Sequence, residues 1–107
     1  MEVLTKAGLS VNEAKVLSYL FKKKEATARE LEQNMRMRQP EVSIATTKLF
    51  NKSLIDRRVI KTGGKGRPRH VYVVKNEAID ILKGWVANKI EELEDTLKEL
   101  DKMRVET

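Results

Sequence analysis

At 107 residues the chain is long enough for one small domain with a limited hydrophobic core. It contains no cysteine, which excludes disulfides, thiolate metal sites and thiol redox switches. No apolar run approaches the ~20 residues of a membrane span, and the first residues lack the pattern of a signal peptide. We therefore expect a cytoplasmic protein that has no membrane partner.

The net charge of +6 is distributed unevenly along the sequence. Residues 1–87 hold 18 basic and 9 acidic side chains, whereas residues 88–107 hold 4 basic and 7 acidic ones. Residues 36–69 alone carry ten lysines and arginines against two acidic residues. Lysine-rich faces are often only solvated, but clustering in one segment favours a surface that faces a polyanion.

The first strong helix signal begins at Ser10. Ser10 and Glu13 have the spacing of a capping box, and apolar residues follow at helical spacing, which predicts a helix from Val11 to about Lys23. The preceding apolar residues predict a short N-terminal helix or arm: Leu4, Ala7 and Leu9. The connector at residues 25–26 is either a loop or a minimal strand that completes a small sheet.

A helix-turn-helix pattern follows. A second capping-box pattern at Thr27 and Glu30 predicts a short helix to about Asn34, and a turn of about four residues precedes a helix over Gln39–Lys52. Proline near the start of that second helix is favourable, because the first-turn amides have no helical partner. Its apolar stripe consists of Val42, Ala45 and Leu49, flanked by Thr46 and Phe50.

The opposite face of the second helix carries the candidate base-reading residues: Gln39, Pro40, Ser43, Ile44 and Thr47. The polar members can donate and accept hydrogen bonds at base edges in the major groove. Ile44 is either a contact to a thymine methyl group or a modest apolar surface patch. The cations beside this face are expected to contact phosphates, which positions a protein without reading sequence: Arg36, Arg38, Lys48 and Lys52.

A basic hairpin follows the second helix. Strands are predicted over Leu54–Lys61 and Arg69–Val74, and the tip between them is rich in glycine. The cations of this tip are expected to contact the DNA backbone or the minor groove: Lys61, Lys65, Arg67 and Arg69. The glycines could also form a nucleotide-phosphate loop, but no helix N-terminus follows them, which favours the hairpin.

Several segments carry a family resemblance. Two stretches resemble the N-terminal domain of archaeal TrmB-type regulators. They read G-L-S-V-N-E-A-K-V-L-S-Y-L and, later, A-T-A-R-E-L. Two further stretches are similar to sequences of the wider MarR/ArsR-like winged-helix group. They read R-Q-P-E-V-S-I-A-T-T-K-L and G-K-G-R-P-R-H-V-Y. The resemblance covers about residues 7–75 and implies that Gln39–Lys52 is the recognition helix and Lys61–Arg69 the wing. Because neither a sugar-sensing domain nor a Cys/His metal site accompanies these motifs, the small-molecule effector is unknown.

The last predicted element is a long amphipathic helix. Asn76 is expected to cap it, and some 28 residues would span about 42 Å, longer than a domain of this size can cover. Trp85 is expected to pack against the body of the domain. A dimerisation role is therefore predicted for the later apolar stripe: Val86, Ile90, Leu93, Leu97 and Leu100. The alternative is a helix that folds back on its own domain.

Enzymatic chemistry has little support in the sequence. His70 is the only histidine, and without cysteine no set of nucleophile, base and orienting residue can be assembled. We therefore predict that the protein is not an enzyme and has no metal site or cofactor.

These observations predict a mainly α-helical fold with a small β-hairpin (α+β). Residues 1–75 would form a winged helix-turn-helix and residues 76–107 a coiled-coil-like dimerisation helix. The function that we expect is sequence-specific binding of double-stranded DNA by a homodimeric transcriptional regulator at the nucleoid. Two alternatives remain open: an architectural chromatin protein with little sequence preference, and a winged helix that binds other proteins.

Overall fold

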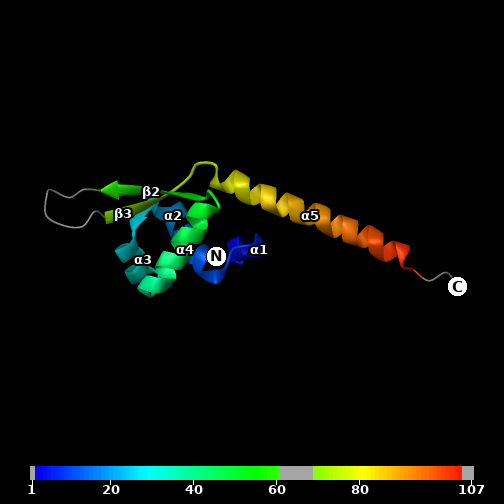
Figure 1. The fold of residues 1–107 in the computed structure, drawn as a ribbon, viewed down its shortest axis with the longest axis horizontal. Coiled ribbons are helices and arrows are strands. Elements are labelled where there is room, and N and C mark those ends of the chain that lie inside the picture. Colours follow the sequence, from blue (N-terminus) through cyan, green and yellow to red (C-terminus); the bar gives the residue numbers. More distant parts are fainter. Residues whose placement is uncertain (1, 61–68, 105–107) are drawn as a thin grey trace.

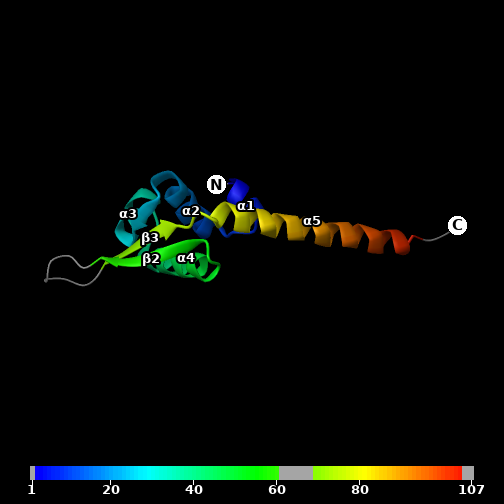
Figure 2. The same cartoon turned by 90° about the horizontal axis from the view of Figure 1, so that it is seen from above.

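The computed structural model describes residues 2–60 and 69–104. The elements in chain order are α1 (Glu2–Lys6), α2 (Val11–Lys23), β1 (Glu25–Thr27), α3 (Ala28–Asn34), α4 (Gln39–Asn51), β2 (Ile55–Ile60), β3 (Arg69–Val74) and α5 (Ala78–Lys102). The elements from α1 to β3 gather at one end, and α5 projects from them as a rod (Figures 1 and 2). This arrangement gives principal extents of 78 × 25 × 20 Å.

The three strands form one antiparallel sheet in the order β1-β3-β2. Tyr72 of the central strand pairs with Ala26 on one side and with Arg57 on the other. The minimal strand considered at residues 25–26 is therefore present, and it completes the sheet next to the hairpin.

The predicted capping box at the start of α2 is confirmed. The Ser10 hydroxyl accepts the Glu13 N–H at 3.2 Å, and a Glu13 carboxylate oxygen accepts the Ser10 N–H at 3.4 Å. Between α1 and α2, Gly8 has a φ of 119°, a conformation that glycine adopts without steric cost. Helix α2 ends at Lys23, and the N–H of the C-cap residue Lys24 donates to the Leu20 carbonyl at 2.6 Å.

The turn between α3 and α4 is held by side chains and backbone together. Thr27 accepts the Glu30 N–H at 3.2 Å as predicted, but the Glu30 carboxylate accepts the Thr27 hydroxyl instead of its N–H, so the second capping box is half formed. At the start of α4, the Arg38 N–H donates to Glu41 Oε1 at 3.0 Å. Glutamate three residues after the N-cap thus fixes the orientation in which α4 begins.

The core lies between α2, α3, α4 and the sheet. The side chains that are completely buried include Leu17, Leu20, Leu31, Leu49, Leu54 and Ile55. The predicted stripe on α4 is buried, and Thr46 joins it because its hydroxyl donates to the Val42 carbonyl at 2.7 Å. This burial leaves the opposite face of α4 turned to solvent.

Helix α5 differs from its prediction at the start. Its N-cap is Glu77, which makes no side-chain capping bond, so the expected cap at Asn76 is wrong. The Ala78 N–H instead donates to the Lys75 carbonyl at 3.1 Å, and this tight turn satisfies a first-turn amide with backbone. The helix has 25 residues, slightly fewer than expected. Within residues 2–60 and 69–104, no helix is long and apolar enough to cross a membrane.

The first two turns of α5 pack on the rest of the fold. Ala78 and Leu82 are buried in the core, and Trp85 packs against it as expected. From Val86 onward every described side chain of α5 is exposed, the later apolar stripe included.

Candidate nucleic-acid interface

The candidate base-reading residues share one exposed face of α4. The set consists of Gln39, Pro40, Ser43, Ile44 and Thr47, and all five side chains are exposed. Ile44 is 58% exposed, an unusual position for a large aliphatic side chain on an otherwise polar face. The face carries hydrogen-bonding groups and one methyl-rich group, which are the chemical types that read base edges.

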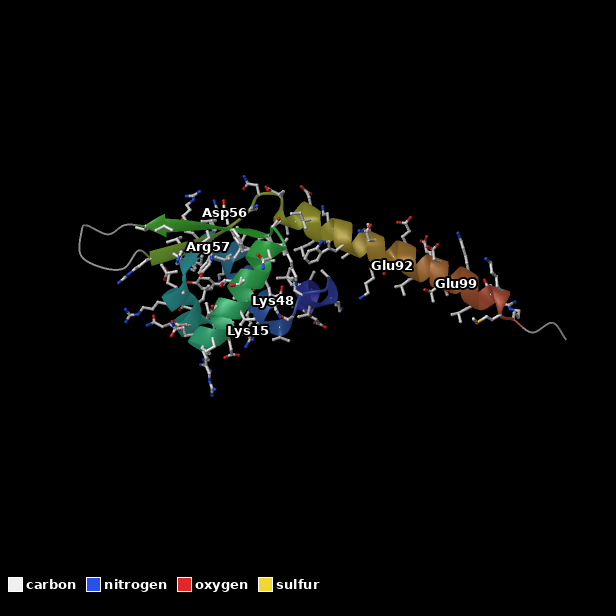
Figure 3. The ribbon with its side chains drawn as sticks, in the orientation of Figure 1. Lys15, Lys48, Asp56, Arg57, Glu92 and Glu99 are labelled. Atoms are coloured by element: carbon white, nitrogen blue, oxygen red, sulfur yellow. The ribbon has the colours of Figure 1, made fainter. Side chains whose placement is uncertain are left out.

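Three of the predicted phosphate contacts lie beside this face. Arg36 and Arg38 are exposed in the turn before α4, and Lys48 is exposed near its C-terminal end (Figure 3). Arg69 is exposed at the first position of β3. The remaining tip cations, Lys61, Lys65 and Arg67, fall outside the described residues.

Lys52 is placed differently from the sequence expectation. Its Nζ lies 2.6 Å from Glu13 Oε2 and 5.8 Å from the centre of the Trp85 ring. Its charge is therefore engaged by the start of α2 and the start of α5, and the structure does not bring it to the exposed face of α4. Sequence reasoning missed this pairing because the two charged residues are 39 positions apart.

The Glu13 carboxylate is buried, with 4% of its side chain exposed. Burial raises the pKa of Glu13, but the hydrogen bonds from Lys52 and Ser10 outweigh burial and leave the pKa below its ordinary value. The ion pair thus ties the C-terminal end of α4 to the first turn of α2.

Glu41 links the other end of α4 to α2. One carboxylate oxygen accepts the Arg38 N–H, and the other accepts Asn12 Nδ2 at 3.3 Å. The bond from Arg38, with a smaller contribution from Asn12, lowers the pKa of Glu41. Helix α4 is therefore held at both ends before any ligand binds.

Arg57 is a candidate contact that the sequence reasoning did not single out. Its Cζ lies 4.8 Å from the centre of the Phe50 ring at the end of α4, a cation–π distance. Figure 3 shows Arg57 on β2, next to α4 and on the same part of the molecule as Lys48. Alternation along β2 could have located it, because the buried Ile55 lies two positions earlier and faces the same side of the sheet.

A shallow hollow of about 340 Å³ lies between α3 and β3. Arg29, Arg69 and His70 bring cationic or titratable groups to it, and Glu32 is its acidic member. Sequence reasoning placed His70 beside the hairpin but did not select Arg29. The hollow therefore lies beside the end of β3 where Arg69 and His70 pair with Ile60 and Val59 of β2.

The described residues contain no group of three or more His, Cys, Asp and Glu side chains that could hold a metal ion. The fold thus presents a polar face of α4, held in place at both ends of the helix and surrounded by cations. Such a surface suits DNA, because cations can contact the phosphates while polar side chains reach the base edges.

A family model matches residues 4–77 of the chain, and its description is "Sugar-specific transcriptional regulator TrmB". The chain belongs to the TrmB family. The match spans α2 to β3 and therefore includes the helix-turn-helix and the hairpin strands. The resemblance read from the sequence motifs is confirmed. The sequence matches none of the curated proteins with which it was compared.

Solved structures show the fold of this TrmB family member. A possible transcriptional regulator from Methanosarcina mazei Go1 is 20% identical with a TM-score of 0.74, covering 92% of this chain and 85% of that one. The ST1889 protein from Sulfolobus tokodaii is 14% identical with a TM-score of 0.71, covering 90% and 91%. PadR from Bacillus subtilis, solved in complex with operator DNA, is 17% identical with a TM-score of 0.59, covering 71% and 46%.

These likenesses confirm the winged helix-turn-helix with a long C-terminal helix that the sequence predicts. The family and the fold are those of transcriptional regulators. In this TrmB family member, α3 and α4 form the helix-turn-helix and β2–β3 the strands of the wing.

Proposed function

We propose that the protein is a transcriptional regulator that binds double-stranded DNA as a homodimer and in a sequence-specific manner. The observation that carries the proposal is the outer face of α4, which is polar, exposed and flanked by Arg36, Arg38, Lys48 and Arg57. Helix α4 would lie in the major groove, and the β2–β3 hairpin would contact the backbone or the minor groove. The fold shared with PadR, which binds operator DNA, supports this docking.

The two parts of this surface would have different tasks. Gln39, Ser43 and Thr47 would hydrogen-bond to base edges, and Ile44 would contact a thymine methyl group. The arginines and lysines around them would neutralise phosphates, which supplies affinity without sequence preference. Because both ends of α4 are held by the Glu13 and Glu41 contacts, the helix would present its polar face in one fixed orientation.

The dimer would form through α5, whose later stripe is apolar and exposed. Ile90, Leu93, Leu97 and Leu100 are each more than half exposed in the single chain. Pairing would remove these side chains from water and join two DNA-binding units of residues 1–75 through the element at residues 76–107. Two half-sites on the DNA follow from such a dimer.

The test is the affinity for a selected duplex and for a random duplex, measured over a range of salt concentrations. In a chain with Gln39→Ala, Ser43→Ala and Thr47→Ala, we expect a loss of ~1–3 kcal/mol for each good base contact on the selected duplex. On the random duplex the same chain should lose almost nothing. Thr96→Ala serves as the matched control, because Thr96 is an exposed threonine on α5, far from the proposed surface.

Arginine variants separate the phosphate contacts in the same measurement. Arg57→Ala should weaken binding to both duplexes and lower the salt slope by about one counterion. Arg58→Ala is the control, since Arg58 is the next residue of β2 and lies on the other side of the sheet. Equal losses of the triple variant on both duplexes would contradict sequence-specific reading, and the architectural chromatin function would take its place.

A further inference from the structure

An apolar groove lies between α1 and the first half of α5. It has a volume of about 590 Å³. Val3, Leu4 and Ala7 form the α1 wall, and the α5 wall consists mainly of Ile79, Leu82, Val86 and Ile90. Val3, Ile79, Val86 and Ile90 are 41–77% exposed, whereas Leu82 is buried, so these four side chains remain open to water in a single chain.

The groove and the apolar stripe of α5 form one continuous surface. Ile90 belongs to both, and the stripe continues at steps of three and four through Leu93, Leu97, Leu100 and Met103, which are 56–75% exposed. Monomeric proteins seldom leave a surface of this kind and extent uncovered. A long helix that is apolar on one side would cover the whole of this surface, and α5 of a second copy is such a helix.

Charge selects the direction in which the second copy lies. Lys6 and Lys83 line the groove, whereas residues 88–107 carry four basic and seven acidic side chains. Glu92 and Glu99 are examples of these acidic residues on the projecting half of α5 (Figure 3). An antiparallel pair brings the acidic half of one helix to the lysine-lined groove of the other. A parallel pair brings the two acidic halves together and sets the two lysine-lined grooves beside each other.

We propose that the groove between α1 and α5 receives the C-terminal half of α5 from a second copy of the chain, in an antiparallel pair. This inference rests on the proposed homodimer and specifies its geometry. In the register that fills both grooves, Val86 faces Leu97 of the partner subunit and Ile90 faces Leu93 of the partner subunit. Helix α1 thereby becomes part of the dimer interface. A parallel pair would gain a contact between Lys89 and Glu94 of the partner subunit, but it would bring no acidic segment to either lysine-lined groove.

The absence of native cysteine makes the direction directly measurable. A chain with Val86→Cys and a differently tagged chain with Leu97→Cys are co-expressed, and the dimers are oxidised with oxidised glutathione. Antiparallel pairing predicts cross-linked dimers that contain one chain of each kind, because only those thiols come within disulfide distance. Cross-links between two identical chains would show parallel pairing and overturn the inference.

The same samples distinguish failure of this inference from failure of the proposed homodimer. If the chain sediments as a monomer at micromolar concentration, both the proposed homodimer and the antiparallel geometry are contradicted. If it is a dimer but forms only cross-links between identical chains, or none, the homodimer stands and the antiparallel geometry is contradicted.

The part of the groove formed by α1 is tested by Val3→Glu. Val3 is so exposed that the substitution should leave the fold intact, but a charge in the covered groove should raise the dimer dissociation constant by about tenfold or more. Val11→Glu is the matched control, because Val11 is a 60% exposed valine that does not line the groove. An unchanged dissociation constant for Val3→Glu would overturn the role of α1, and the groove would then be free for a small apolar ligand.

Discussion

Helices α4 and α5 both carry an apolar stripe at helical spacing, but the stripe of α4 is buried and the later stripe of α5 is exposed. On α4, Val42, Ala45 and Leu49 are at most 2% exposed, whereas Leu93, Leu97 and Leu100 on α5 are 56–63% exposed. Helix α4 is covered by α2, α3 and β2, but α5 leaves the body after Trp85 (Figure 1). Apolar periodicity therefore determines which face of a helix needs a partner. Whether one chain can supply that partner depends on how far the helix extends beyond its neighbours.

Removal of residues 88–107 should produce the largest effect. It deletes Ile90, Leu93, Leu97 and Leu100, each worth ~1.5–3 kcal/mol if buried in a dimer. The shortened chain should sediment as a monomer at micromolar concentration and lose tight DNA binding, while the thermal unfolding of the body remains cooperative. A shortened chain that stays dimeric would place the interface elsewhere, with α1 as the next candidate.

A pair of identical substitutions tests the contrast between the helices directly. Leu49→Ala removes a completely buried side chain, so the free energy of unfolding should fall by ~2–5 kcal/mol. Leu97→Ala should change it by less than about 0.5 kcal/mol at concentrations where the chain is monomeric. Chemical denaturation at low protein concentration measures both. Equal losses would mean that α5 folds back on its own body.

The sequence predicted those features of the fold that depend on local chemistry. The bounds of α2 and β3 and the buried stripe of α4 follow from capping residues and periodicity, which act over a few residues. The cap expected at Asn76 was wrong because a backbone turn satisfied the amide that the side chain would have bonded. Local patterns cannot decide between two competing partners for one donor.

The candidate site was predicted less completely than the fold. The outer face of α4 could be predicted from the rotation of about 100° per residue in an α-helix. Its role in base reading stays a prediction. The pairing of Lys52 with Glu13 and the position of Arg57 over Phe50 depend on how distant segments pack. A lysine at the end of a helix has the same local pattern whether it meets a phosphate or a buried carboxylate.

The ion pair beneath α4 gives a prediction that depends on pH. Lys52→Met leaves the buried Glu13 carboxylate without its partner, so the free energy of unfolding at neutral pH should fall by ~1–3 kcal/mol. In the native chain the pKa of Glu13 is lowered, so its contribution is present above the ordinary glutamate pKa of about 4.3 and is lost as pH falls through the lower folded value. The difference between the two chains should therefore shrink on acidification.

Urea denaturation at several pH values between neutral and strongly acidic measures this effect. Lys48→Met is the matched control, because Lys48 lies one turn earlier on α4 and its side chain is exposed. It should change the unfolding free energy by less than about 0.5 kcal/mol at every pH. A constant difference between the native chain and Lys52→Met across the whole range would contradict the role given to Glu13.

The smallest expected effect concerns Ile44, the one large aliphatic residue on the polar face of α4. If its side chain contacts a thymine methyl group, Ile44→Ala should weaken binding to a selected duplex by ~1 kcal/mol, the value of about one buried methylene group. Replacing the contacted thymine by uracil removes the thymine methyl group, and thus the same contact, from the DNA side of the interface. Native chain on the uracil duplex should then bind like Ile44→Ala on the thymine duplex, and combining both changes should cost little more. Val11→Ala, at a similarly exposed position on α2, should affect neither duplex. If Ile44→Ala loses the same affinity on both duplexes, the residue is a surface patch, and α4 reads DNA with its polar groups alone.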